Sequence, residues 1–314
     1  MSTFTVLMSR NRVARARQRK TANMVMLALT GLLMALALVP LFWIIGYVLI
    51  RGGKNINLDF FIHLPRPLGM TGGGVLSAIE GTLVVTFLAA LFSIPPGVLA
   101  AFYAARYPNT PVGVVLRFST DVLSGIPSIV VGLFAYSIIV IPMGHYSGLA
   151  GGVALAVIML PTIIRTTEEM LKLVPGTLRE ASLGLGAPEW KTSLSVLFPA
   201  ASSGIVTGFL LALARAAGET APLLMTSLGN ERFDIKQIVQ GGIQGHQSVF
   251  TILGRIINQP VDSLPLALWK YAQQPYPERV DQAWSIALVL MLFVLIVNVT
   301  ARVWIQSRAR RMKG

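Results

Sequence analysis

Six apolar stretches, each long enough to cross a lipid bilayer, constrain the fold of this chain most strongly. A bilayer core about 30 Å thick requires roughly 20 helical residues at a rise of about 1.5 Å per residue. Within that core each backbone polar group must be satisfied inside the protein, which favours α-helices. We therefore predict an all-α polytopic membrane protein with six transmembrane helices. They lie near Asn23–Ile50, Ala78–Ala105, Asp121–Ile141, Gly148–Ile164, Ser203–Leu228 and Ala283–Val303.

The composition agrees with this class and argues against a soluble protein. Of the 314 residues, 54% are hydrophobic and only 12% are charged, whereas a typical soluble domain carries about 25% charged residues. The chain has no cysteine, and its three histidines are scattered. Disulfides, thiolate chemistry and zinc-site spacings are therefore excluded, and we expect no metal and no cofactor.

The formal net charge of +13 comes from 26 Lys and Arg against 13 Asp and Glu. Such a charge alone would suggest a nucleic-acid partner. The basic residues, however, are concentrated in two tails, Arg10–Lys20 and Arg302–Lys313, which flank the apolar stretches. We therefore expect no nucleic-acid partner, and we expect the N-terminal tail to contact anionic membrane lipid.

The distribution of basic residues also predicts the orientation in the membrane. Six spans place both termini on one side, and short cytoplasmic loops carry an excess of Lys and Arg. Seventeen of the 26 lie on the side of the termini: six in the N-terminal tail, six in the two loops of that side and five at the C-terminal end. Eight lie on the other side, and Arg215 lies within a span. Both termini are therefore predicted to be cytoplasmic.

Two of the predicted loops are too long to be simple connectors. One covers about residues 165–192 on the cytoplasmic side, and the other covers about residues 229–282 on the external side. Loops of this length are usually functional or disordered.

The cytoplasmic loop contains the segment VPGTLREASLGLGAPEWKTSLSVLFPAA, which predicts two short helices around a turn. Pro175-Gly176 breaks the chain, and Thr177 with Glu180 forms the Thr-x-x-Glu pattern of a capping box. Gly186-Ala187-Pro188 supplies the turn, and Pro199 marks the start of the fifth span.

This loop resembles that of the permeases of ATP-binding-cassette importers, which carry Glu-Ala-Ala, a later glycine, and Ile-x-Leu-Pro. The matching positions are Glu180, Ala181, Gly186, Val196, Phe198 and Pro199, with Ser182 in place of the second alanine. The resemblance implies the type I importer permease fold and alternating access. It also implies that the Thr177–Gly186 helix docks on an ATPase subunit, with Glu180, Ala181 and Gly186 at the contact.

The implied organisation is a basic cytoplasmic tail over residues 1–22, a transmembrane permease domain over residues 23–306 and a second basic tail over residues 307–314. The chain contains no Gly-x-x-x-x-Gly-Lys-Ser/Thr phosphate-binding loop. We therefore expect it not to be an enzyme, and we expect a separate partner chain to hydrolyse ATP.

Arg215 and Glu219 are four residues apart in the fifth predicted span, which places them on one helix face. An ionisable residue in a span costs about 2.5–3.5 kcal/mol on insertion scales and usually faces a bundle interior or a water-filled path. Arginine suits a tetrahedral oxyanion because its planar fork offers paired donors. The residues alone leave two interpretations open, a structural ion pair and a substrate path.

Three further segments, DVLSGIPSIVVGL, PTIIRTTEEMLKLVP and ARAAGETAP, resemble the phosphate-uptake branch of these importers. This resemblance favours the substrate path and assigns Arg215, Glu219 and Thr220 to it. Arg165 is either a gate or exit site of that path, or a charged anchor beside a solvated helix. The implied partners are a homologous permease subunit, an ATPase dimer and a periplasmic phosphate-binding protein, in a bacterial inner membrane.

Other functions stay open at this stage. A buried arginine does not distinguish phosphate from sulfate or molybdate, so an importer of another oxyanion is the first alternative. An ion-coupled carrier with Glu219 as its proton site is the second. A non-transporting membrane scaffold is the third, and the coupling-type loop argues against it.

Overall fold

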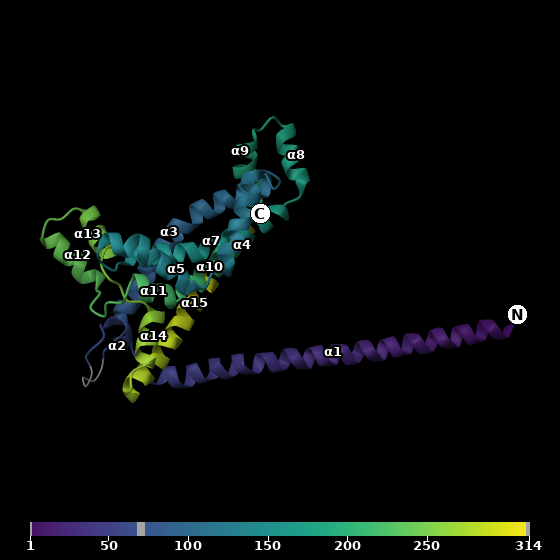
Figure 1. Ribbon diagram of the computed structural model, residues 1–314, viewed down its shortest axis with the longest axis horizontal. Coiled ribbons are helices and arrows are strands. Elements are labelled where there is room, and N and C mark those ends of the chain that lie inside the picture. Colours follow the sequence, from purple (N-terminus) through teal and green to yellow (C-terminus); the bar gives the residue numbers. More distant parts are fainter. Residues whose placement is uncertain (1, 68–72, 312–314) are drawn as a thin grey trace.

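The computed structural model describes residues 2–67 and 73–311, and every regular element in these ranges is helical (Figure 1). The α-helices are α1 Ser2–Gly52, α2 Leu58–Ile62, α3 Leu76–Arg106, α4 Pro111–Gly125, α5 Ser128–Ala135, α6 Ile141–Met143, α7 Gly148–Lys172, α8 Gly176–Gly184, α9 Glu189–Thr192, α10 Phe198–Ala217, α11 Ala221–Thr226, α12 Ile235–Gln244, α13 Val249–Ile257, α14 Leu264–Ala272 and α15 Pro277–Arg311. A 3-10 turn, η1 Gly53–Asn55, and two π-helical segments, η2 Tyr136–Val140 and η3 Ser193–Leu197, complete the set.

The described residues contain five helices that are long and apolar enough to cross a membrane, and a bent pair that makes a sixth span. The predicted all-α class is therefore confirmed. α8 and α9 project from one end of the bundle, and α12 and α13 project from another (Figure 1). We call these the α8–α9 end and the α12–α13 end. The last residues of the predicted 307–314 tail, 312–314, lie outside the described residues.

The third span differs from the single helix predicted over Asp121–Ile141. α4 begins ten residues earlier, where Thr110 caps it by accepting a hydrogen bond from Gly113 N. It ends at Gly125, and the next helical segment leaves at an angle of 105°. Pro127 causes the break because it disfavours helical backbone at Ile126. Asp121 consequently lies inside α4 rather than at a helix start.

The fourth and fifth spans also have different limits from those predicted. α7 continues beyond Ile164 to Lys172, so Arg165 belongs to a helix rather than to the loop predicted over residues 165–192. The fifth span begins earlier, at Glu189, and its helix ends at Ala217. The chain is non-helical at Gly218–Thr220 before α11 begins, so the helix predicted as continuous over Ser203–Leu228 is interrupted.

Glycines let α7 pack closely against α3 on one side and α10 on the other. A Cβ at Gly97 of α3 would press on Ile163, and one at Gly152 of α7 would press on Leu88. On α10, a Cβ at Gly208 would overlap Thr166. Replacing side chains by hydrogen at these points lets the helix axes approach, as in other membrane helix contacts. The main buried apolar cluster lies along this three-helix contact.

α1 leaves the bundle, and its C-terminal end packs against α15 (Figure 1). The Tyr47 ring lies 4.8 Å from that of Trp284 in an edge-to-face contact. Most of the described apolar side chains of α1 are exposed, including Trp43 at 74%. An apolar helix with this exposure matches a lipid environment.

The long loop after the fifth span is ordered, and its residues 259–264 are packed into the α12–α13 end. Leu264 N donates to Thr82 Oγ1 of α3 at 2.8 Å, and Ser227 Oγ donates to the Val261 carbonyl at 2.6 Å. Asp262 is fully buried there, and burial raises the pKa of its carboxyl while Lys270, 3.6 Å away, opposes that shift. The alternative of a disordered loop is therefore wrong for this segment.

Gly81 provides a test of this packing. A Cβ at this position would overlap the Asp262 carbonyl oxygen. We expect Gly81→Ala to force the 259–264 segment away from α3 and to destabilise the protein by about 1–3 kcal/mol. Thermal unfolding of the detergent-solubilised protein measures this. Gly31→Ala is the control, because a Cβ there meets nothing within 4 Å; equal melting temperatures for the two variants would contradict the packing described.

Candidate functional site

Arg215 and Glu219 form an ion pair across the interruption after α10. Arg215 lies in the last turn of α10, Glu219 lies beyond its end, and Arg215 Nε is 3.6 Å from Glu219 Oε1. The spacing predicted that the two side chains share one face of a continuous helix. This prediction is wrong, because the helix ends between them. The Arg215 side chain is 55% exposed and that of Glu219 is 20% exposed. This pair is loose, and the arginine is open to a ligand.

Arg215 lies level with the middle of α7. It lines a small cavity together with Ser124 beside the α4–α5 bend and Pro161 and Thr162 of α7. The cavity holds about 20 Å³, roughly the space that one water occupies. Thr220 stands just before α11, and its carbonyl accepts from Leu224 N at 3.1 Å. The structure thus gathers hydroxyl groups and one guanidinium at this depth.

A larger polar pocket of about 210 Å³ lies between α4 and α7. All of its lining residues are of polar or charged types, and they include three basic and three acidic side chains. The lining residues are Arg117, Thr120, Asp121, Arg165, Glu168, Glu169 and Lys172. In this pocket Arg165 forms an ion pair with Asp121, which joins α7 to α4.

The Arg215 cavity and this polar pocket lie one helical turn apart. On α7, Thr162 lines the cavity and Arg165 lines the pocket; on α4, Ser124 lines the cavity and Asp121 lines the pocket. Three residues of an α-helix advance by about 4.5 Å. The two sites therefore form a short polar series that leads from mid-bundle toward the α8–α9 end.

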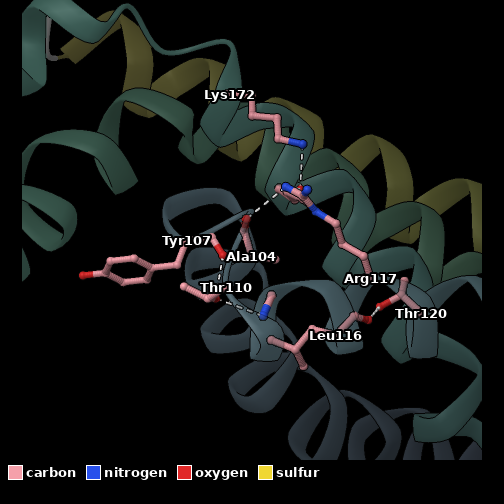
Figure 2. Close-up of polar contacts among 9 residues, drawn as sticks. Ala104, Tyr107, Thr110, Leu116, Arg117, Thr120 and Lys172 are labelled. Atoms are coloured by element: carbon pink, nitrogen blue, oxygen red, sulfur yellow. Dashed lines mark hydrogen bonds and ion pairs between the residues drawn. The ribbon is translucent and has the colours of Figure 1, made fainter.

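Glu168 is the centre of an ion-pair network in the polar pocket. Arg117 Nε lies 2.8 Å from Glu168 Oε1, and Lys172 Nζ lies 2.6 Å from the same oxygen. Arg117 Nη2 also donates to the Ala104 carbonyl of α3 at 3.0 Å. Figure 2 shows Arg117 reaching from α4 toward Ala104 and Lys172. Only 9% of the Glu168 side chain is exposed, so its charge depends on these two cations.

The loop between α7 and α10 forms the predicted pair of short helices, α8 and α9. Gly186 has φ +83°, a conformation that glycine adopts without strain, and it turns the chain between them. The predicted capping box is wrong: α8 begins at Gly176 after Pro175, with no side-chain cap. Pro175 itself leads the chain into the helix, so Thr177 already lies inside α8. Thr177, Glu180, Ala181 and Gly186 are all exposed on the projecting loop.

Three side-chain contacts that no sequence pattern indicated hold this loop together and join it to α3. Ser182 Oγ and Thr192 Oγ1 are 2.9 Å apart, which gives a structural reason for serine in place of the second alanine. Glu189 pairs with Arg106 at the end of α3, at 2.9 and 2.5 Å, and with Arg179 of α8 at 2.7 Å. The residue types suit these contacts, but no sequence spacing indicates that α3 and α9 meet.

Most of the chain matches one known protein family. Residues 97–314 match the family described as binding-protein-dependent transport system inner membrane component. The chain belongs to this family. It is therefore a multi-pass inner-membrane component of a transporter, not an enzyme, and such a transporter works with ATP-binding-cassette partner subunits.

Individual relatives of this family member carry a more specific name. The phosphate transport system permease protein PstA of Yersinia pestis is 39% identical over 91% of this chain and 90% of its own length. The protein of the same name from Xylella fastidiosa strain 9a5c is 43% identical over 80% of this chain and 81% of its own length.

The fold of this family member is also found in a solved structure. One inward-facing structure of the MetNI methionine ABC transporter aligns with a TM-score of 0.53 and 19% identity, over 74% of this chain and 94% of that one. The likeness confirms the ABC importer permease fold expected from the coupling-type loop.

The Glu168 network makes a prediction about stability. Glu168→Gln removes the charge that Arg117 and Lys172 share, and it leaves a half-buried guanidinium without its carboxylate. We expect a loss of about 1–3 kcal/mol in unfolding free energy. Glu169→Gln is the matched control, because Glu169 lines the same pocket but is exposed. Equal chemical-denaturation midpoints for the two variants would contradict a structural role for the network.

Proposed function

We propose that this chain is the permease subunit of an ATP-driven importer for inorganic phosphate. The observation that carries the proposal is the placement of Arg215: an open guanidinium at mid-bundle depth, one turn from a pocket with further basic side chains. The relatives named as phosphate transport permeases support the choice of cargo.

Arg215 would bind the phosphate oxyanion through its paired N–H donors. The 3.6 Å separation from Glu219 leaves the guanidinium free to exchange its partner. Glu219 then competes with phosphate for Arg215, which keeps binding weak enough for release. The hydroxyls of Ser124 and Thr162, which line the same cavity, would supply neutral hydrogen-bonding groups beside it. Thr220 would contribute to the path from the interruption after α10.

Arg165 would take the anion next, at the gate toward the exit. It is engaged by Asp121 in the structure, so α4 and α7 are held together there. A phosphate that reaches Arg165 replaces the aspartate as its partner, and the α4–α7 contact then loosens. Arg165 would then be both an anion-binding residue and part of a gate, which is one of the two roles expected for it from the sequence.

The proposed partners follow from the two ends of the bundle. The exposed loop with Thr177, Glu180, Ala181 and Gly186 would dock on a PstB-type ATPase dimer in the cytoplasm. In the proposed orientation both termini, with the tails 1–22 and 307–314, would lie on the same side. A PstC-type homologous permease would complete the path within domain 23–306. A PstS-type periplasmic phosphate-binding protein would deliver the anion to the external end, including the 229–282 region.

Arg215→Gln tests the cargo path. Losing the guanidinium charge should lower phosphate uptake into proteoliposomes at least about tenfold, since each charge-assisted contact contributes about 1.5–3 kcal/mol. Arg302→Gln, an exposed arginine on α15 outside both proposed docking surfaces, is the control and should leave uptake unchanged. Labelled sulfate measured in parallel decides the oxyanion: uptake of sulfate in preference to phosphate would contradict the proposed cargo, and uptake without ATP would indicate an ion-coupled carrier.

Glu180→Arg tests the docking surface. Because Glu180 is exposed on α8, reversing its charge should reduce the ATPase that co-purifies in mild detergent several-fold without unfolding the chain. Glu278→Arg, an exposed glutamate in the first turn of α15, is the control. An ATPase yield that is equal in both variants would place the docking surface elsewhere.

A further inference from the structure

Glu189 connects the projecting loop to the transmembrane helix α3, which is distant from it in the sequence. Its two carboxylate oxygens accept hydrogen bonds from Nε and Nη2 of Arg106, the last residue of α3. Arg179 of α8 contacts Glu189 Oε1, the same oxygen that accepts from Arg106 Nη2. A paired contact of this kind fixes relative orientation as well as distance, so α3, α8 and α9 meet at one carboxylate.

The end of α3 and the start of the loop are not closely packed against each other. A cavity of about 140 Å³ separates the end of α3 from the loop; it is lined by Phe102, Ala105 and Arg106 on one side and by Pro175, Gly176 and Arg179 on the other. Phe102 stacks on Phe198 at the start of α10, with ring centroids 5.9 Å apart, but this contact lies beyond the two loop helices. The apolar packing at the end of α3, where Phe102 and Ala105 share a cluster with Val174 and Leu197, involves the two flanks of the loop. The helix α9 itself is joined to α3 by the Arg106–Glu189 ion pair.

The last turn of α3 is also hydrogen-bonded to a residue of the polar pocket. The Ala104 carbonyl accepts from Arg117, whose guanidinium is paired with Glu168 of α7. Ala104 and Arg106 are two residues apart on the same turn, so one short stretch of backbone is held by the loop through Glu189 and by the pocket through Arg117. A shift of this turn acts on both.

We propose that Glu189 is a positioning residue for coupled transport: through Arg106 it makes the last turn of α3 move with the loop, and this turn carries the movement to the Arg117–Glu168 network, which shares its pocket with the Arg165–Asp121 gate. The proposal rests on the proposed function, because it takes the loop as the site where the ATPase acts. The chain itself already joins the loop to α10 through η3. Glu189 adds a second connection, to the α3 side of the pocket.

The first experiment compares transport with ATP consumption in the reconstituted transporter, which contains both permeases, the ATPase and the binding protein. Glu189→Gln keeps the shape of the side chain and removes its charge. We expect the ATPase to co-purify as with the unaltered chain, but phosphate moved per ATP hydrolysed to fall about fivefold or more, the scale of a typical coupling between sites. Lys191→Gln, an exposed charge change on the same short helix, is the matched control and should keep the ratio.

A charge exchange separates this role from general stability. Arg106→Glu combined with Glu189→Arg keeps one acidic and two basic groups at the junction, and it should restore the ratio that either single change lowers. A role in stability alone predicts instead that each single change lowers the melting temperature together with the ratio. Single variants that keep the melting temperature and lose the ratio therefore support the positioning role.

A distance measurement tests the mechanical part without relying on transport activity. The chain has no cysteine, so spin labels can be placed at Leu185 on the loop and at Asn109 beyond the end of α3, both exposed. We expect one narrow distance distribution in the unaltered background, with and without ATP, and a broad one with Glu189→Gln.

The outcomes distinguish the two proposals. If the unaltered chain fails to bind an ATPase or to move phosphate, the proposed function fails. If the unaltered transporter is coupled, and Glu189→Gln keeps both the transport ratio and the narrow distance, only the role of Glu189 is overturned.

Discussion

Helix α7 packs closely between α3 and α10, and the Arg215 cavity and the polar pocket beside α4 both depend on that placement. Gly97 and Gly152 admit α3 on one side, and Gly208 admits α10 on the other. Because these contacts are made by backbone and small groups, α7 has little freedom to rotate or shift. The side chains that project from it, Thr162, Arg165 and Glu168, therefore meet α4 and α10 at fixed heights.

The class of fold was predictable because it rests on a local property. An apolar run of sufficient length crosses the membrane as a helix whatever its neighbours are, so the six spans and the projecting two-helix loop were found from the sequence. Helix limits were less accurate where local signals were misread. Pro127 bends the third span, and the helix of the fourth continues to Lys172 although charges begin at Arg165.

The candidate site was predictable only in part, for a similar reason. Arg215 and Glu219 were identified because charges within apolar runs are costly and therefore conspicuous. The partners of Arg165 and Glu168 were not identified, since Asp121 and Arg117 lie on a different helix and about 50 residues away in sequence. Glu189 was missed because a glutamate on a polar loop is ordinary until the end of α3 is seen beside it. Long-range charge pairing needs the packed structure.

The two ends of the bundle are closed by different kinds of bond. At the α12–α13 end the 259–264 segment is held largely by buried neutral hydrogen bonds to Thr82, Ser227 and the start of α7. At the α8–α9 end, α4, α7, α3 and the loop are joined by ion pairs, several of them partly exposed. Dissolved ions screen exposed charges and scarcely affect buried neutral bonds. A rise in ionic strength should therefore weaken the contacts at the α8–α9 end and leave those at the α12–α13 end nearly unchanged. The two ends of the bundle thus differ in how strongly salt affects their packing.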